Sequence, residues 1–108
     1  MPTPPTISTR ARAHLRSLAH HLEPLSQIGH EGITEAYVES VSVLLERHEL
    51  IKVRVAQAYE GDRREVARAL ATSLGADLSQ MIGRVIVLYR PRASKKKDPK
   101  RPPIVLPE

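Results

Sequence analysis

Apolar residues recur along this chain with two spacings, one typical of helices and one typical of strands. From about residue 8 to residue 22, Leu15, Leu18, Ala19 and Leu22 have helical spacing, and Pro24 is expected to end that helix. The stretch PLSQIG that follows is a candidate short strand.

Residues 33–49 have helical spacing again, with acidic residues opposite the apolar ones, which predicts an amphipathic helix. Thr34 is the expected N-cap, and Glu35 follows it at the positive end of the helix. The apolar positions are Ile33, Tyr37, Val41, Leu44 and Leu45.

The stretch ELIKVRVA alternates, which predicts a strand with one apolar face and a basic face formed by Lys52 and Arg54. Next comes a helix in which Asp62 and Glu65 have the spacing of a capping box and Gly75 is the expected left-handed cap. Its buried stripe is predicted to be Val66, Ala67, Leu70 and Leu74.

ADLSQMIG and RVIVLYR are two further strands, joined by a tight turn at Gly83 and Arg84. The last strand is apolar on both faces and is therefore expected inside the sheet. The fold class is α/β, a small four-stranded mixed sheet with three helices in the order α-β-α-β-α-β-β. The final PIVLPE is a candidate for docking back on the domain as an extended segment.

The composition fits one domain of 108 residues, with 41% hydrophobic residues and three aromatic residues, all Tyr. The lack of Cys excludes disulfides and thiol chemistry. With neither a membrane-length apolar run nor a signal peptide pattern, we expect a cytoplasmic protein. The predicted division is a disordered 1–7, a domain over 8–91 and a basic, Pro-rich arm over 92–108.

The net charge of +5 arises entirely in residues 90–108, which carry seven Lys or Arg and two acids. Residues 1–89 carry ten of each, but unevenly, with arginines in the first helix and acids in the second. One side of the protein should therefore attract phosphate. An alternative interpretation of the basic tail is a segment that only increases solubility. For Lys52 and Arg54, the alternative is that they are solvent-exposed strand residues without a binding role.

QIGHEGIT places Gly29 and Gly32 between a strand and a helix. One interpretation is a turn that needs glycine for its backbone. The other is a phosphate cradle, because two glycines let a nucleic acid backbone approach the loop amides, as in the KH module.

A set of motifs in order is more specific than the glycine pair. LAH, the G-x-x-G followed by ITEA, HELIKV, IGRVIVLYRP and a terminal IVLP resemble the YhbY-like proteins of the CRM family, from about Arg10 to Pro107. The family is named for chloroplast RNA splicing and ribosome maturation. The resemblance implies RNA binding to precursors of the large ribosomal subunit, without catalysis. It also implies a fold similar to the C-terminal domain of bacterial translation initiation factor three, with a KH-like loop added.

By this resemblance Gly29 and Gly32 match the family loop, and Arg16, Lys52, Arg84 and Arg90 match its recurring basic positions. His30 and Glu31 depart from the Lys or small polar residues usual between the glycines. The complete predicted RNA-binding set is Gly29, His30, Glu31, Gly32, Arg10, Arg12, Arg16, Lys52, Arg54, Arg84, Arg90, Arg92, Lys95, Lys96 and Lys97.

Other functions have weaker support in the sequence. The five histidines lack metal-ligand spacing, no catalytic signature is present, and we expect neither a cofactor nor a small-molecule substrate nor a membrane partner. A monomer is expected. The alternative function is a protein-interaction module that docks on a ribosomal protein or assembly factor through its acidic helix.

Overall fold

The computed structural model describes residues 7–91 and residue 104. Its elements are α1 (Thr9–Ala19), β1 (Pro24–Ile28), α2 (Glu35–His48), β2 (Leu50–Val55), α3 (Arg63–Leu74), β3 (Asp77–Ile82) and β4 (Val85–Tyr89). The predicted fold class and element order are confirmed. Arg92, Lys95, Lys96 and Lys97 lie outside the described residues, as do residues 1–6 of the predicted N-terminal segment.

The four strands form one mixed sheet in the order β1-β2-β4-β3. β1 pairs in parallel with β2, whereas β4 is antiparallel to both β2 and β3. The predicted interior position of the last strand is confirmed. Gly83 has a φ of 57° in the two-residue turn of the β3–β4 hairpin, a backbone angle that favours glycine.

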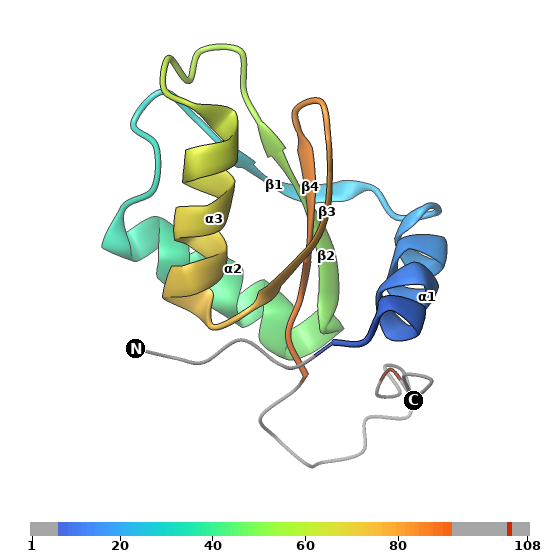
Figure 1. Ribbon diagram of the computed structural model, residues 1–108. Coiled ribbons are helices and arrows are strands. Elements are labelled where there is room, and N and C mark those ends of the chain that lie inside the picture. Colours follow the sequence, from blue (N-terminus) through green and yellow to red (C-terminus); the bar gives the residue numbers. More distant parts are fainter. Residues whose placement is uncertain (1–6, 92–103, 105–108) are drawn as a thin grey trace.

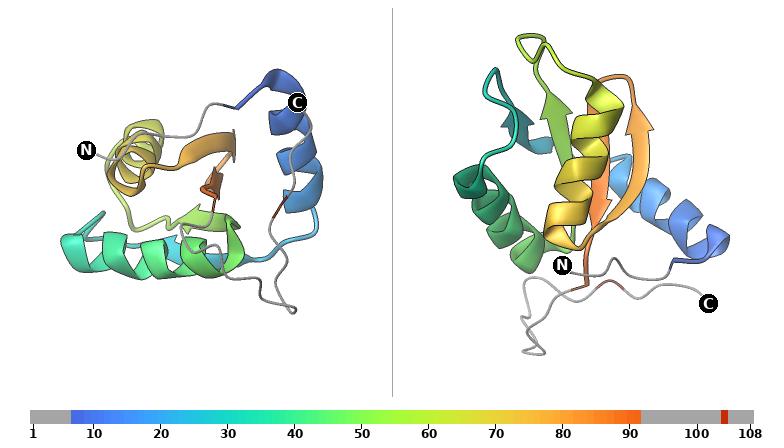
Figure 2. Two further views of the ribbon diagram at one scale, coloured as in Figure 1. Left: turned by 90° about the horizontal axis from the view of Figure 1, so that it is seen from below. Right: turned by 60° about the vertical axis from the view of Figure 1, so that its left-hand side comes forward.

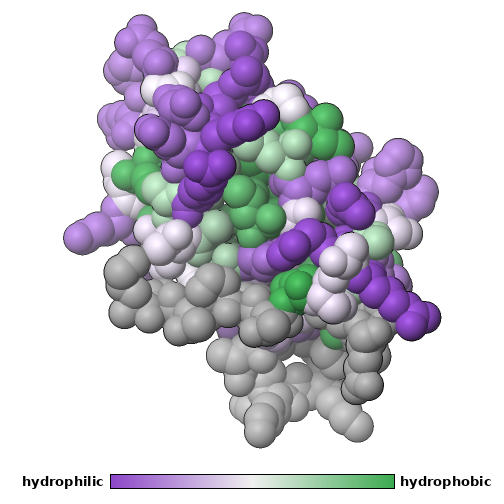
Figure 3. Space-filling view, in the orientation of Figure 1, coloured by the Kyte–Doolittle hydropathy of each residue, from purple (hydrophilic) through white to green (hydrophobic). Residues whose placement is uncertain are grey.

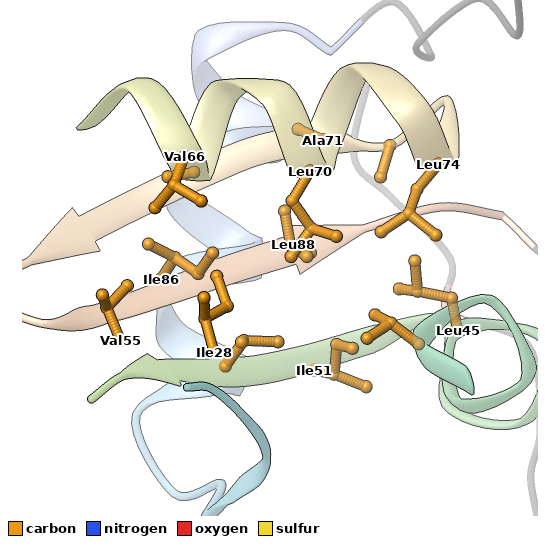
Figure 4. Close-up of a cluster of buried hydrophobic side chains, with 14 residues drawn as sticks. Ile28, Leu45, Ile51, Val55, Val66, Leu70, Ala71, Leu74, Ile86 and Leu88 are labelled. Carbon is orange, nitrogen blue, oxygen red and sulfur yellow. The ribbon is translucent and has the colours of Figure 1, made fainter. Parts of the chain in front are cut away.

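Helices cover both faces of the sheet, so the molecule has three layers (Figures 1 and 2). α2 and α3 pack on one face over the larger cluster of buried side chains, which includes Leu45, Leu70, Ile51 and Ile86 (Figure 4). α1 packs on the opposite face over a smaller cluster. That cluster comprises Leu15, Ala19, Leu50, Val87 and Tyr89, with Ile7 and Ile104 packed against it.

The predicted helix ends around α2 and α3 are present. The Thr34 side chain accepts a hydrogen bond from the Tyr37 amide at 3.1 Å, and Asp62 accepts from the amides of Arg64 and Glu65. Gly75 ends α3 in the left-handed conformation, with φ 63° and ψ 35°. These caps satisfy helix-end groups that would otherwise lack partners.

The first helix is shorter than predicted, and only two of its four predicted apolar positions, Leu15 and Ala19, are buried. It ends at Ala19 instead of near Leu22, and Leu18 and Leu22 are each 38% exposed. The buried residues are Ala11, Leu15 and Ala19, because small side chains let the helix approach the sheet closely. The chain turns after Ala19, where the Leu22 amide donates to the Ala19 carbonyl at 2.9 Å.

The expected docking of the C-terminal stretch is confirmed at Ile104. Its side chain packs against the smaller cluster, and its amide donates to Glu49 Oε1 at 3.1 Å. Glu49 itself is buried and has a φ of 62°, the one positive φ at a non-glycine position among the described residues. A residue far along the chain thus completes the α1 side of the core.

The core assignment leads to a stability prediction. Leu70 is fully buried in mid-α3, and Leu70→Asp places an unpaired charge in the larger cluster. We expect the domain to lose more than about 3 kcal/mol of unfolding free energy, or to fail to fold. The matched control Ala69→Asp, at the exposed neighbouring position, should cost under about 1 kcal/mol. Urea unfolding followed by circular dichroism measures both, and equal midpoints would contradict the assignment.

Candidate nucleic-acid interface

Three connections meet at one end of the sheet, here called the loop end (Figure 1). They are the G-x-x-G segment after β1, residues 56–62 between β2 and α3, and the β3–β4 hairpin turn. They lie together because the carboxyl ends of β1, β2 and β3 meet there. The sheet topology therefore places the glycine pair, Arg84 and the start of α3 at the same end of the sheet.

The glycine pair forms a closed turn. The Gly32 amide donates to the Gly29 carbonyl at 3.0 Å, so His30 and Glu31 occupy the two central positions, and both are exposed. Within residues 7–91 and 104, the amides of His30 and Glu31 have no hydrogen-bond acceptor. These two donors are available to an anion.

The backbone requires glycine at position 32 but not at position 29. Gly32 has a φ of 72°, and an added Cβ there would lie 3.3 Å from Tyr59 Cε2. Gly29 has no positive φ, and an added Cβ would meet no atom within 4 Å. The backbone interpretation therefore explains Gly32 but leaves Gly29 unexplained. Open space above Gly29 is what close approach of a ligand to the backbone requires.

Tyr59 holds the loop end together. Its ring lies against both Gly32 and Gly61, where an added Cβ would lie 2.5 Å from the Tyr59 hydroxyl. The ring also packs on the larger cluster, which connects both loops to the core. The G-x-x-G turn is thus supported by a side chain from a different loop.

The α1 side of the sheet remains open toward the loop end. Lys52 and Arg54 lie on this face, two residues apart on β2, so they are separated by roughly 7 Å along the strand. Arg16 and His20 project from α1 over the same region. Together they border a hollow of 320 Å³ that is lined by Arg16, His20, Lys52, Gln80, Ile82, Val85 and Val87.

This hollow combines cationic edges with an apolar floor. No acid is among its lining residues, and Ile82 at its edge is 64% exposed. Arg54 pairs in the ladder with Gln27 and with Val85, which places it between the hollow and the loop end. We call the combination of this hollow, Arg54, Arg84 and the G-x-x-G turn the basic face.

Other predicted site residues lie away from the basic face. Arg12 forms an ion pair with Asp77 at 2.8 Å, at the other end of β3. Arg10 is exposed in the first turn of α1. Arg90 donates to the Leu74 carbonyl at 3.0 Å and to the Ser42 carbonyl at 2.9 Å, joining α2 to the last residue of α3. Arg12 and Arg90 therefore have structural partners.

Sequence reasoning missed several residues that line the hollow. His20 is absent from the predicted RNA-binding set, and so are the strand residues Gln80, Ile82 and Val85. Their shared face follows from the register of β3 against β4, in which Gln80 lies opposite Val87 and Ile82 opposite Val85. The alternation of side chains along the two hairpin strands could have placed Gln80, Ile82 and Val85 on one face. It could not have shown that Arg16 of α1 lies over that face.

Metal sites and membrane-spanning helices are both absent from the described residues. They contain no group of three or more His, Asp or Glu residues placed to hold a metal ion. Among them, no helix is both long enough and apolar enough to cross a membrane.

The contrast between the arginines can be measured. Arg90→Gln removes charge-assisted hydrogen bonds to carbonyls and should cost about 2–4 kcal/mol of unfolding free energy. Arg54→Gln removes the same charge from an exposed position and should change stability by under about 0.5 kcal/mol. Thermal unfolding of the two variants compares them, and an unchanged Arg90→Gln midpoint would show that these bonds contribute nothing.

Comparison with known proteins agrees with this architecture. The chain is 38% identical to an RNA-binding protein of Haemophilus influenzae over 91 residues, covering 84% of this chain and 92% of the relative. It is 39% identical to the probable RNA-binding protein YqeI of Bacillus subtilis over 90 residues, covering 83% and 94%.

The solution structure of the hypothetical protein SAV1595 from Staphylococcus aureus has the same fold. It matches with a TM-score of 0.72 and 38% identity, over 94% of this chain and all of that one. The model of the CRS1 / YhbY (CRM) domain matches residues 7–90, which include every described helix and strand. The chain therefore belongs to the CRS1/YhbY (CRM) domain family.

Proposed function

We propose that this protein binds RNA through the basic face. Two relatives whose matches cover more than 80% of this chain, at 38% and 39% identity, are named an RNA-binding protein and a probable RNA-binding protein. The observation that carries the proposal is the position of Gly29, which has no structural need to be glycine among the described residues and lies in a turn with two unused amides. The turn lies at the same end of the sheet as Arg54 on β2 and Arg84 in the hairpin, and Arg16 lines the hollow on the α1 side.

The physical mechanism is phosphate binding without extensive base reading. The amides of His30 and Glu31 supply neutral donors, and Arg16, Lys52, Arg54 and Arg84 supply charge. The chain has no Phe or Trp, so stacking platforms like those of RRM domains are absent. The apolar floor of the hollow can accept a ribose or a base edge. Sequence specificity should therefore be modest.

Glu31 opposes this mechanism. Its carboxylate is exposed at the centre of the turn, and a like charge within about 4 Å of a phosphate costs about 1 kcal/mol in water. A carboxylate can instead accept a hydrogen bond from cytosine N4. Glu31 thus either weakens the loop or gives it a preference among bases.

The family resemblance extends the proposal to the RNA itself. We infer ribosomal RNA in precursors of the large subunit as the target, with a role in assembly and no catalysis. The likeness to the C-terminal domain of translation initiation factor three and to KH loops is part of this proposal. The proposal also includes a domain over residues 8–91, a monomeric state and a cytoplasmic location. It includes the basic arm as an added RNA contact, through Arg92, Lys95, Lys96 and Lys97.

Sucrose-gradient sedimentation with and without RNase tests the ribosomal part. RNase-sensitive migration with large-subunit precursors supports it. RNase-resistant migration would favour the alternative, docking on a protein through α2. That alternative has one structural observation in its favour, since Glu35 and Glu39 line a shallow hollow between α2 and α3.

Substitution of Gly29 tests RNA binding by the turn. Gly29→Asp adds bulk and negative charge where the backbone is open, without strain or overlap. We expect at least a ten-fold weaker affinity for single-stranded RNA, with unchanged thermal stability. Fluorescence anisotropy with a labelled oligonucleotide measures the affinity.

The matched control is Gly29→Asn, which has the same shape without the charge. Its affinity should lie between those of the parent and of Gly29→Asp. Equal affinity in all three folded proteins would show that the turn does not contact RNA.

A further inference from the structure

A second hollow lies on the opposite face of the sheet, between α3 and the β3–β4 hairpin. It encloses 630 Å³, and its lining includes Arg63, Arg64, Arg68, Leu78, Met81 and Gly83. In Figure 3 an apolar strip with hydrophilic borders is visible between α3 and the hairpin. We call it the α3 hollow.

Arginines supply the charge of the α3 hollow. Arg63, Arg64 and Arg68 are exposed, and none of them forms an ion pair within residues 7–91 and 104. Arg64 and Arg68 are four residues apart, so their side chains lie on one side of α3. Three cations are thus concentrated along one wall.

The nearby acid is already engaged. Asp62 lines the hollow, but its Oδ1 accepts hydrogen bonds from the amides of Glu65 at 3.0 Å and Arg64 at 2.8 Å. The hydrogen bond from the Glu65 amide has the largest effect on the pKa of Asp62 and lowers it. Desolvation, which is next in size, raises this pKa, but the Arg64 amide and the charges of Arg64 and Arg68 lower it further, so it lies below its usual value. Because Asp62 occupies these helix-end donors, attraction for an anion must come from the arginines.

The hairpin separates the α3 hollow from the basic face. Along β3, Leu78 and Met81 face α3, whereas Gln80 and Ile82 line the hollow beside α1. The turn at Gly83 and Arg84 forms the rim between them (Figure 1). A ligand that crosses this turn can contact both faces.

We propose that the α3 hollow is a second binding groove for RNA backbone, occupied by a strand that passes over the hairpin turn from the basic face. This inference rests on the proposed RNA binding and adds a separate surface to it. Charge favours RNA over an uncharged partner, and an apolar floor of Leu78 and Met81 suits a ribose or base between phosphate contacts. Continuity with the basic face favours RNA over an acidic protein.

Met81 provides a direct probe of the hollow. The chain has two methionines, Met1 and Met81, so 13C-methyl labelling gives two signals, which Met81→Leu assigns. We expect a single-stranded RNA of about 20 nucleotides to shift the Met81 methyl signal. The shift should be lost in Arg64→Ala/Arg68→Ala, which removes two exposed cations. Polyglutamate represents an acidic protein partner and should leave the Met81 methyl signal in place. A shift of this signal with polyglutamate but not with RNA would overturn the proposal.

Salt dependence gives a second readout. The binding constant for single-stranded RNA is measured at several salt concentrations, and its logarithm is plotted against the logarithm of the salt concentration. Because Arg64→Ala/Arg68→Ala loses two phosphate contacts, the slope of this plot should become flatter by about 1.4. The control Arg47→Glu changes net charge by the same amount at the C-terminal end of α2 and should flatten it by much less.

The outcomes separate the two proposals. Suppose that the parent binds RNA and that Gly29→Asp weakens this binding. If the Met81 methyl signal then does not shift, and the double variant has the same salt slope as Arg47→Glu, RNA does not contact the α3 hollow and only the basic face is supported. If the parent binds no RNA, both proposals fail.

Discussion

Burial of β4 on both faces is the constraint on which the rest of the structure depends. Ile86 and Leu88 enter the larger cluster, whereas Val87 and Tyr89 enter the smaller one. A strand of this kind must be central, and it pairs with both β2 and β3. Each face then needs its own helical layer, which α2 and α3 supply on one side and α1 on the other (Figure 2).

The burial of Tyr89 under α1 also affects its hydroxyl group. Desolvation raises the pKa of Tyr89, and the nearby charge of Glu49 raises it further.

One helix covers one face of the sheet and two cover the other, and this uneven coverage creates the candidate interface. α1 has 11 residues, or about 16 Å of helix, and it buries Leu50 and Tyr89 at one end of the sheet. The same face remains open at the loop end, where β2 can carry Lys52 and Arg54 without a desolvation cost. The glycine turn and the hairpin meet there because of strand direction alone. The site is therefore a consequence of incomplete coverage.

Local rules predicted much of the fold, because the relevant signals lie within a few residues. The caps at Thr34, Asp62 and Gly75 and the hairpin at Gly83 each depend on chemistry read within one turn of the chain. For α1 the prediction was wrong at Leu18 and Leu22, which are more hydrophobic than Ala11 but are each 38% exposed, whereas Ala11 is buried. Only the tertiary fit to the sheet selects the smaller residues.

Site residues were harder to predict for the same reason. The structural role of Arg90 could not be predicted, because its partners Ser42 and Leu74 are distant in sequence. Arg64 and Arg68 are absent from the predicted RNA-binding set, because only the fold places Leu78 and Met81 beside them. Gly29 was predicted as part of a pair, and only its φ and its surroundings separate it from Gly32.

The central claim is that RNA occupies the loop end and the open face beside α1. Amide chemical-shift mapping by NMR, during titration of the folded protein with single-stranded RNA, tests it most directly. The account predicts the largest shifts in residues 29–32 and at Lys52, Arg54 and Val85, with little change at Glu35 and Glu39 on α2. Saturable shifts concentrated on α2, with residues 29–32 and Arg54 unmoved, would contradict it.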